Sequence, residues 1–417
     1  YIEDFKLQNF EKNPVVICSL GDNSVTEGEV AEAFQFAALH QLPIIFLVQD
    51  NEWGISVTKE EARTSDAYDY AAGFVGLNRM RIDGTDFVES FIQMQKAVHF
   101  VREERKPLLV CAKTVLIGHH TSGVRREFYR DEADLAKHRA KDPGIILKKY
   151  LLEEGFSEET LSQIEIEARK QIEEDFNKAI LAPDPKPETV KEHVYAPTPI
   201  TEEKGTRIPE NGEKIPMVDA GIHAIQELMH KHPEALLYGQ DVGGRIGGVF
   251  REAVTLQQKF GNKRVFNTAI QEAYIIGSTV GMSAVGLKPI VEVQFADYIY
   301  PGINQLVTEV SKSCYLSNGK YPVSSIIRVP IGAYGGGGPY HSGSVETMLA
   351  QIKGIKIAYP SNAADFKGLF KAAFYDPNPV IFLEHKGLYW SKVPGTEDAK
   401  TVEPAEDYIL PFGKANI

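Results

Sequence analysis

The first third of the chain carries two short motifs whose oxygen atoms could bind a metal ion together with a phosphate. Gly21-Asp22-Asn23 follows one apolar, β-rich run, and Asp50-Asn51 follows the next run along the chain. Asp22 and Asn51 offer hard side-chain oxygens, and Mg²⁺ uses such ligands while sharing its other positions with phosphate oxygens and water. A backbone carbonyl just beyond Asn51 could supply a third ligand. The pattern therefore predicts a site for Mg²⁺ and a diphosphate.

The spacing of these motifs carries more information than either motif alone, since each by itself is more often an ordinary turn or loop. A gap of 51 − 22 = 29 residues holds one predicted helix and one predicted strand. Both motifs then lie at the carboxyl ends of neighbouring parallel strands, where open α/β sheets bind ligands. Gly21 lets the backbone approach phosphate, and the amino end of a helix over 27–40 presents N–H groups to anions.

The elements that must position these motifs alternate between strand and helix. Strands are predicted over 15–20 and 44–48, and the helix between them has an apolar stripe that includes Phe34, Ala37 and Ala38. Thr26 and Glu29 predict a capping box at the start of that helix. A helix near 86–104, a strand over 108–115 and a charged surface helix over 158–180 complete a first parallel-sheet domain.

A second domain of the same type follows a proline-rich segment. Seven prolines lie between residues 183 and 216, which favours an extended linker. Strands are then predicted near 235–241, 264–270, 288–295, 323–330, 355–360 and 379–385. The expected fold class is α/β, with two doubly wound, mainly parallel sheets. We assign residues 1–182 to the first domain, 183–216 to the linker, 217–400 to the second domain and 401–417 to the start of a further one.

Composition excludes several classes of function. The formal net charge of −12 and the lack of a basic run argue against nucleic-acid binding. Three distant cysteines predict neither a disulfide framework nor a zinc site. No apolar run approaches the ~20 residues that span a bilayer, and no signal-peptide pattern opens the chain, so a cytoplasmic protein without a membrane partner is expected.

The two motifs also match the thiamine diphosphate motif, which opens with Gly-Asp-Gly and closes with Asn-Asn; here Asn23 and Asp50 depart from it. The longer runs Gly21-Asp22-Asn23-Ser24-Val25-Thr26-Glu27-Gly28-Glu29 and Asp50-Asn51-Glu52-Trp53-Gly54-Ile55-Ser56 resemble the α subunit of 2-oxo acid dehydrogenases. By that resemblance, Asp22, Asn51 and the Trp53 carbonyl are Mg²⁺ ligands.

The second half resembles the β subunit of the same enzymes, most closely the branched-chain type. The resemblance rests on Phe266-Asn267-Thr268-Ala269-Ile270-Gln271-Glu272 and Gln294-Phe295-Ala296-Asp297-Tyr298-Ile299-Tyr300-Pro301. Taken alone, Glu272 is most simply a negative charge at a helix N-terminus. The resemblance makes it the carboxyl that bonds the aminopyrimidine ring and assists proton removal. The implied cofactor-binding residues are Gly21, Asp22, Asn23, Ser24, Gln49, Asn51, Trp53, Ile270, Gln294 and Tyr298.

A histidine pair lies in the polar loop after the strand ending near Val115. Gly118-His119-His120 would ordinarily be a surface feature, but the family has the same sequence here, which makes His120 the expected catalytic residue near the diphosphate. Thr121 occupies the position that is phosphorylated in mammalian branched-chain enzymes. Val124 and Arg125 replace the acidic pair of that loop, which argues against phosphorylation control.

A second histidine is singled out by Tyr340-His341-Ser342-Gly343, which resembles the family's Tyr-His-Ser-Gln. There the histidine assists acyl transfer to a lipoyl group, and imidazole suits this step because it ordinarily titrates near neutral pH. The four glycines before it, 335–338, lack the lysine of a phosphate-binding loop and are interpreted as a turn.

Gly277 and Gly281 give the helix after Glu272 a face of small residues, which lowers its intrinsic stability unless another helix packs closely there. The resemblance implies a subunit interface, hence a homo-oligomer. A helix contact within one chain explains the same pattern.

The expected function is oxidative decarboxylation of a small 2-oxo acid by thiamine diphosphate and Mg²⁺, with acyl transfer to lipoyl-lysine of an acyltransferase partner. Two alternatives stay open, a transketolase or deoxyxylulose phosphate synthase, and a catalytically silent scaffold. Branched-chain 2-oxoisovalerate is favoured over pyruvate by resemblance alone. Since family members extend beyond both ends of this sequence, we expect a fragment of a longer protein.

Overall fold

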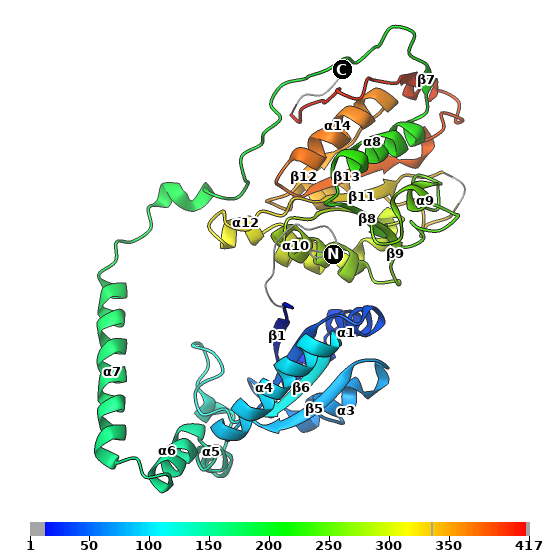
Figure 1. Ribbon diagram of the computed structural model, residues 1–417. Helices are drawn as coiled ribbons and strands as arrows, with labels where there is room; N and C mark the ends of the chain where they lie inside the picture. The colour runs from blue at the N-terminus through cyan, green and yellow to red at the C-terminus, as the bar shows by residue number, and fades with distance from the viewer. Residues whose placement is uncertain (1–12, 335–336, 414–417) are drawn as a thin grey trace. The chain divides into compact units, whose positions relative to one another are not determined.

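The computed structural model describes residues 13–334 and 337–413, which form two compact α/β units. One unit ends at Pro185 and the other begins at Lys186. Each is built on a parallel sheet (Figure 1). Apolar clusters pack on both faces of each sheet. The predicted fold class, two doubly wound parallel-sheet domains, is therefore confirmed.

The first unit has a four-stranded sheet in the order β1-β2-β6-β5, with every pair parallel. Its strands are β1 (Val16–Gly21), β2 (Ile44–Asp50), β5 (Asn78–Asp83) and β6 (Leu108–Lys113). One face packs against Phe34 of α1 (Gly28–His40), and the other packs against Val101 of α4 (Phe87–Glu104). Because β1 and β2 are adjacent, the two predicted motifs emerge at the same edge of the sheet.

The predicted capping box at the start of α1 is wrong. Residues 22–26 instead form a short 3₁₀ helix, η1 (Asp22–Thr26), and Thr26 Oγ1 bonds the carbonyl of Asn23. Glu27 is the N-cap of α1, and its carboxylate accepts the N–H of Glu29. The tight turn after β1 occupies Thr26, so the cap falls one residue later.

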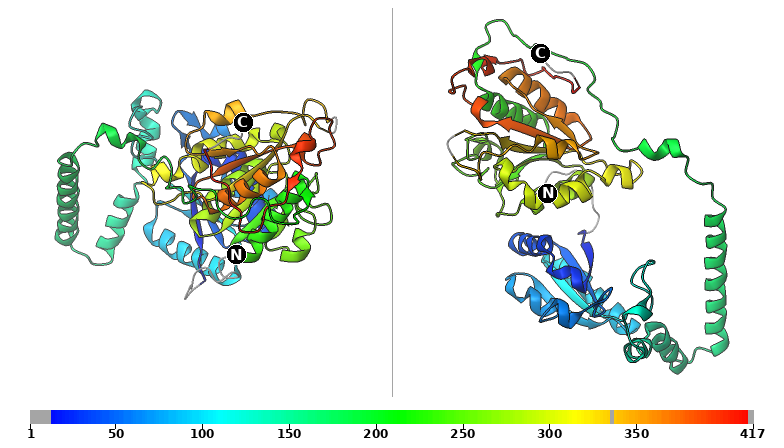
Figure 2. Two further views of the ribbon diagram at one scale, coloured as in Figure 1. Left: turned by 90° about the horizontal axis from the view of Figure 1, so that it is seen from above. Right: turned by 180° about the vertical axis from the view of Figure 1, so that it is seen from behind.

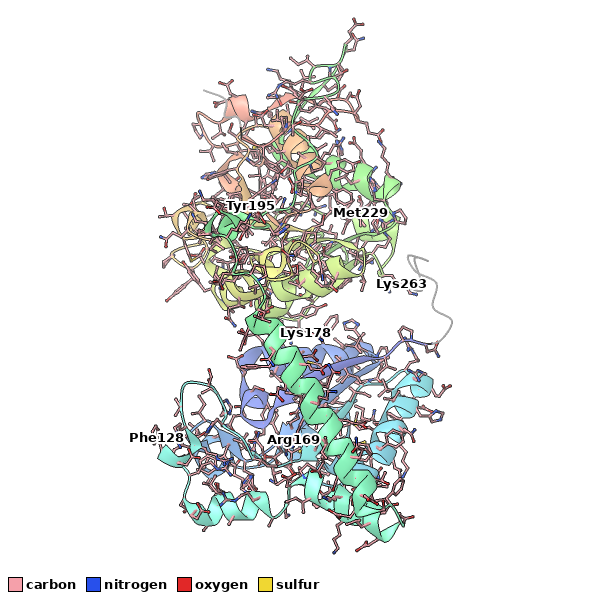
Figure 3. The ribbon with its side chains drawn as sticks, turned by 90° about the vertical axis from the view of Figure 1, so that its left-hand side faces the viewer. Phe128, Arg169, Lys178, Tyr195, Met229 and Lys263 are labelled. Atoms are coloured by element: carbon pink, nitrogen blue, oxygen red, sulfur yellow. The ribbon has the colours of Figure 1, made fainter. Side chains whose placement is uncertain are left out.

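The rest of the first unit consists of two short strands and a series of helices. They are β3 (Trp53–Gly54), β4 (Val57–Thr58), α2 (Lys59–Ala62), α3 (Ala67–Tyr70), η2 (Ala71–Gly73), η3 (Arg126–Phe128), α5 (Glu132–Arg139), α6 (Pro143–Glu153) and α7 (Glu158–Ile180). The predicted charged helix over 158–180 is confirmed as α7, which buries only Leu161 and carries the labelled Arg169 and Lys178 (Figure 3).

The second unit has a six-stranded parallel sheet in the order β12-β13-β11-β10-β8-β9. Helices α8 (Met217–Lys231) and α14 (Ala363–Tyr375) cover one face, and α10 (Glu272–Ala284) covers the other (Figures 1 and 2). The strands are β8 (Ala235–Gly239), β9 (Val265–Asn267), β10 (Lys288–Glu292), β11 (Ile326–Ile331), β12 (Lys356–Ala358) and β13 (Val380–His385). All six strands were predicted from the sequence, and each is shorter in the structure than predicted.

Further short elements connect these strands. They are η4 (Pro187–Lys191), β7 (Lys214–Ile215), α9 (Leu256–Phe260), η5 (Ala296–Tyr298), α11 (Tyr300–Gln305), the π-helix η6 (Leu306–Val310), α12 (Ser313–Leu316), α13 (Glu346–Ala350), η7 (Lys386–Leu388), η8 (Glu397–Ala399) and β14 (Thr401–Val402). β14 pairs antiparallel with β7.

The small-residue face of α10 meets its neighbours within the unit at Gly277. A side chain there would place its Cβ 2.8 Å from Oε1 of Gln305, whereas a Cβ at Gly281 would meet nothing within 4 Å. The contact within one chain therefore explains Gly277, and the predicted homo-oligomer stays a prediction.

The segment predicted as a free linker is in part fixed to the second unit. The Ala196 N–H donates to Asn378 Oδ1 over 2.7 Å, and the Tyr195 hydroxyl donates to the Ile355 carbonyl over 3.2 Å. Tyr195 is labelled in Figure 3. These polar contacts hold the segment in place. Among the described residues, no helix is long and apolar enough to cross a membrane.

Candidate functional sites in the two units

The first candidate site lies at the carboxyl ends of β1 and β2, where two buried carboxylates face one guanidinium. Asp22 and Asp50 are 2% and 3% exposed. Nη2 of Arg63 lies 2.8 Å from Asp22 Oδ2 and 2.7 Å from Asp50 Oδ1. Burial raises the pKa of Asp22, the Arg63 charge opposes this, and the Asp50 charge adds to it. One cation thus balances two carboxylates in a buried position.

The short capped helix α2 places Arg63 at this site. Thr58 and Glu61 form a capping box on α2, and Arg63 is the residue that ends this helix. Beside it, Glu52 binds Lys59 over 2.7 Å and Lys113 over 2.6 Å. Although burial works to raise the pKa of Glu52, the hydrogen bonds from these lysines hold it below its usual range. The rim of the site is therefore a network of ordered charges.

Three buried polar atoms at this site have no hydrogen-bond partner in the described part of the chain. They are Asp22 Oδ2, Asn23 Oδ1 and Arg63 Nη1; the short contact between Asp22 and Arg63 is an ion pair without hydrogen-bond geometry. Two cavities of about 280 and 500 Å³ are both lined by Arg63. The two acceptor oxygens suit a metal ion, and the cationic donor suits an anion bound to that metal.

Other predicted residues of the first site are held by local bonds. Asn51 Oδ1 accepts the N–H of Trp53 over 3.0 Å. The Trp53 ring lies against the guanidinium of Arg130, 5.2 Å from its centre. Gln49 Nε2 donates to Ser19 Oγ over 2.9 Å, so its side chain links β2 to the neighbouring strand β1.

Ser24 and Gly21 are likewise bonded to each other, because Ser24 Oγ donates to the Gly21 carbonyl over 2.7 Å. This bond closes the turn that begins η1. Both residues thus shape the backbone that presents Asp22, and the Ser24 hydroxyl is used within the turn.

The histidine loop shows a different arrangement from the one expected. His119 Nδ1 accepts the N–H of Arg126 over 3.2 Å. His120 is exposed, and its ring makes no hydrogen bond to any described residue. The structure therefore does not bring the expected catalytic His120 into contact with Asp22 or Asn51.

The root of that loop is clamped at Leu116 by two buried side chains. His138 Nδ1 accepts the Leu116 N–H over 3.0 Å, and Arg130 Nη1 donates to the Leu116 carbonyl over 2.7 Å. Arg130 also binds Asp134 over 2.6 Å. Burial lowers the pKa of His138, and the Arg130 charge lowers it further. His138 is thus held neutral, with Nδ1 as acceptor.

The second candidate site is centred on Glu272, the first residue of α10, which is 8% exposed. Gln240, just after β8, donates from Nε2 to Glu272 Oε1 over 2.9 Å. Gln294 donates to Asp241 Oδ2 over 2.7 Å and to the Gln240 carbonyl over 3.3 Å. These residues follow β8 and β10, so the carboxyl edge of the second sheet holds a fixed, buried carboxylate. Ile270 is 83% exposed and lies outside this contact network.

Tyr298 and His341 are brought together, although 43 residues separate them. The Tyr298 hydroxyl lies 2.7 Å from His341 Nε2, and His341 Nδ1 lies 2.9 Å from the Gly337 carbonyl. The His341 ring packs edge-on to Phe295. Lys386, which is 1% exposed, donates to the His341 carbonyl and lies over the Phe295 ring.

Beneath the second site, three strands carry a buried ionic cluster. Arg328 on β11 binds both oxygens of Glu384 over 2.7 and 2.8 Å, and binds Glu292 over 2.9 Å. Burial raises the pKa of Glu292, and the neighbouring Glu252 carboxyl raises it further. Burial likewise raises the pKa of Glu252, against the Arg328 charge.

The sequence alone missed Arg63, Gln240 and Lys386. Arg63 lies 41 residues after Asp22 and has no spacing that marks it, since only the α2 cap turns it toward the site. Gln240 directly precedes Asp241 at a predicted strand end, a position that favours ligand contact. Lys386 follows the last strand of the sheet in the same way. Strand ends were thus the available signal for two of the three.

Two family models match the chain, and the boundary between the two structural units lies close to the end of the first match. Residues 5–188 match the family model "Dehydrogenase E1 component", and residues 213–391 match "Transketolase, pyrimidine binding domain".

Individual relatives share about two-fifths of the aligned residues. The 2-oxoisovalerate dehydrogenase subunit beta of Bacillus subtilis is 41% identical over 200 residues, covering 48% of this chain and 59% of that subunit. The pyruvate dehydrogenase E1 component subunit beta of Acholeplasma laidlawii is 40% identical over 203 residues, covering 49% and 60%. The chain thus spans less than two thirds of the relatives it matches. It carries, in order, one region that matches the dehydrogenase E1 component family and one that matches the transketolase pyrimidine-binding domain family.

Proposed function

We propose that the first unit carries a half-site for the diphosphate end of thiamine diphosphate and the second unit a half-site for its aminopyrimidine end, and that the protein uses this cofactor to decarboxylate a 2-oxo acid. The observation that carries this proposal is the buried, oriented Glu272 carboxylate within the region that matches a pyrimidine-binding domain. The unpartnered polar atoms around Asp22 supply the complementary feature in the region that matches the E1 component family.

In the first site, Asp22, Asn51 and the Trp53 carbonyl would hold Mg²⁺, and Arg63 would bind a phosphate oxygen. The Trp53 N–H occupies one lone pair of Asn51 Oδ1 and leaves the other for the metal. Arg63 Nη1 is a buried donor that needs an acceptor, and a phosphate supplies one. Gly21, Asn23, Ser24 and Gln49 keep the supporting role that their contacts suit.

In the second site, Glu272 would bond a ring nitrogen of the aminopyrimidine and exchange a proton there. Gln240 fixes one oxygen of the carboxyl group, which sets the direction of the other. Gln294 and Tyr298 would line the same pocket. Bound thiamine diphosphate supplies the electron sink that lets carbon dioxide leave.

The relatives' printed names, 2-oxoisovalerate and pyruvate dehydrogenase subunits, support a 2-oxo acid as the substrate class. We propose 2-oxoisovalerate as the favoured substrate, a lipoyl-bearing acyltransferase as acyl acceptor, and a homo-oligomer as the working form. His120 would act near the diphosphate, which requires the exposed loop to move toward Asp22. His341 would act in the transfer step.

A second candidate is a catalytically silent scaffold. Its support is the Arg63 guanidinium, which already neutralises Asp22 and Asp50 where a metal ion is proposed. A transketolase-type activity has the support of the second family model's description alone.

Decarboxylation can be tested on the full-length protein with 2-oxo acids and a dye as electron acceptor. We expect dye reduction that requires thiamine diphosphate, and a loss of ~10²–10⁴-fold in Glu272→Gln. The exposed Glu309→Gln of the same unit is the matched control and should keep the wild-type rate. Absence of dye reduction with every 2-oxo acid, in a protein that still binds the cofactor, would favour the scaffold.

A further inference from the structure

The geometry at His341 determines which of its ring nitrogens can exchange a proton. The Gly337 carbonyl can only accept a hydrogen bond, so Nδ1, 2.9 Å away, carries a proton in both charge states of the ring. In the neutral ring, Nε2 therefore carries the lone pair. Within the described residues, its one hydrogen-bond partner is the Tyr298 hydroxyl, 2.7 Å away.

The surrounding residues fix the orientation of the two rings relative to each other. Phe295 packs edge-on to both rings, with centroids 4.7 Å from His341 and 5.3 Å from Tyr298. Lys386 fixes the His341 backbone through its carbonyl, and Asp297 accepts the N–H of Gly343 over 2.9 Å. A ring fixed at its backbone, its face and both nitrogens cannot turn toward a ligand without losing several contacts.

We propose that Tyr298 and His341 form a proton relay in which the Tyr298 hydroxyl is the group that touches the acyl acceptor. His341 is then a positioning residue and proton reservoir that acts only through Tyr298. This inference rests on the proposed function and assigns to Tyr298 a role beyond lining the cofactor pocket.

The relay supplies the proton that the transfer of an acyl group to a cyclic disulfide requires. One sulfur bonds the carbon left by decarboxylation, and the S–S bond breaks with its electron pair on the other sulfur. The disulfide is reduced and the carbon is oxidised. That carbon would become the thioester carbonyl as its bond to the cofactor breaks, with the electron pair staying on the cofactor and its hydroxyl proton passing to solvent. Tyr298 gives its hydroxyl proton to the departing sulfur, which becomes a thiol, and the protonated His341 gives its Nε2 proton to the Tyr298 oxygen. His341 is left neutral with its proton on Nδ1, and solvent restores the second proton.

The tautomer can be measured on the protein without cofactor or substrate, by ¹⁵N NMR of labelled histidine rings assigned with His341→Ala. We expect neutral His341 to carry its proton on Nδ1, and its Nε2 signal to shift in Tyr298→Phe. A neutral ring protonated on Nε2 would overturn the relay while leaving the proposed function intact.

The transfer step can be measured on the full-length protein with lipoamide as the disulfide acceptor. Tyr298→Phe and His341→Ala should each slow acyl transfer ~10²-fold, and the double variant should be no slower, because the two residues act as a unit. Added imidazole should restore part of the rate to His341→Ala and none to the double variant. Tyr340→Phe, an exposed tyrosine beside His341, is the matched control and should keep its rate.

Two outcomes contradict the relay directly. Tyr298→Phe that keeps the wild-type rate, or imidazole rescue that is undiminished in the double variant, would show that His341 meets the acceptor itself. A wild-type protein that decarboxylates no 2-oxo acid would refute the proposed function and the relay together.

Discussion

The two buried carboxyl groups of the candidate sites are held by partners of different charge. Glu272 and Asp22 are both buried carboxylates, yet Glu272 is held by the neutral amide of Gln240 and Asp22 by the cation Arg63. A neutral donor orients a carboxyl group and leaves it free to exchange protons. A cation stabilises the charged form, which suits a residue that must stay ionised beside a metal.

The cluster under the second site gives a prediction for pH dependence. Burial raises the pKa of Glu252 and of Glu292, so the folded state binds protons that the unfolded chain releases above about pH 4.3. Their contribution to stability is therefore complete below that pH and is lost as the pH rises through the folded-state values. Glu252→Gln should remove part of this loss.

Urea unfolding at a series of pH values measures the effect as the difference between wild type and Glu252→Gln. The variant should gain stability relative to wild type as the pH rises from 4 toward neutrality. A difference that stays constant over this range, or that grows as the pH falls, would contradict the shared burial of these carboxyl groups. Glu309→Gln, at an exposed position, serves as the control.

At the scale of elements, the loop that carries His120 has an ordered root and an exposed tip. His138 and Arg130 hold both backbone groups of Leu116, while the tip at His120 lacks such bonds within the described residues. A loop of this form can move its tip around a fixed base. The clamp therefore suits a histidine that must approach a bound diphosphate.

Hydrogen exchange at the Leu116 amide tests the clamp. His138→Leu removes the acceptor of this N–H, and a net hydrogen bond of about 1 kcal/mol predicts roughly 5-fold faster exchange. Burial and Arg130 lower the pKa of His138, so its contribution is present above the unfolded value near 6.5 and is lost as the pH falls through the folded value. Lys141→Ala, just beyond α5, is the control. Unchanged exchange in His138→Leu would rule the clamp out.

Patterns within an element were predictable from the sequence, whereas contacts between elements were only partly so. The stripe of α1 and the charged face of α7 have a period that their own residues reveal. The cap of α1 was misplaced because η1, set by the turn after β1, takes up Thr26. The Arg63 contact was unpredictable because it depends on where α2 ends in space.

For the second site, the family resemblance pointed to Glu272, Gln294 and His341, and position alone favoured only a helix N-terminal charge for Glu272. The Tyr298–His341 bond joins a 3₁₀ turn to a loop 43 residues later, and no local pattern encodes it. His120 shows the opposite case, where the motif was informative about the family but the side chain has no hydrogen-bond partner among the residues that the structure describes.

At the scale of the whole molecule, the chain joins two α/β units through a segment that is polar and partly anchored. Each unit matches a different family model and contributes a different chemical half, a cation-and-anion site in one and a buried carboxyl group held by an amide in the other. If one cofactor uses both, a change in either half must weaken the same binding event.

Calorimetric titration of thiamine diphosphate into the full-length protein, with and without Mg²⁺, tests that central claim most directly. We predict one binding event per site pair that requires Mg²⁺ and that weakens in both Asp22→Asn and Glu272→Gln, while Glu309→Gln binds as wild type. Binding that needs only one of the two residues, or that ignores Mg²⁺, would contradict the assignment of one half-site to each unit.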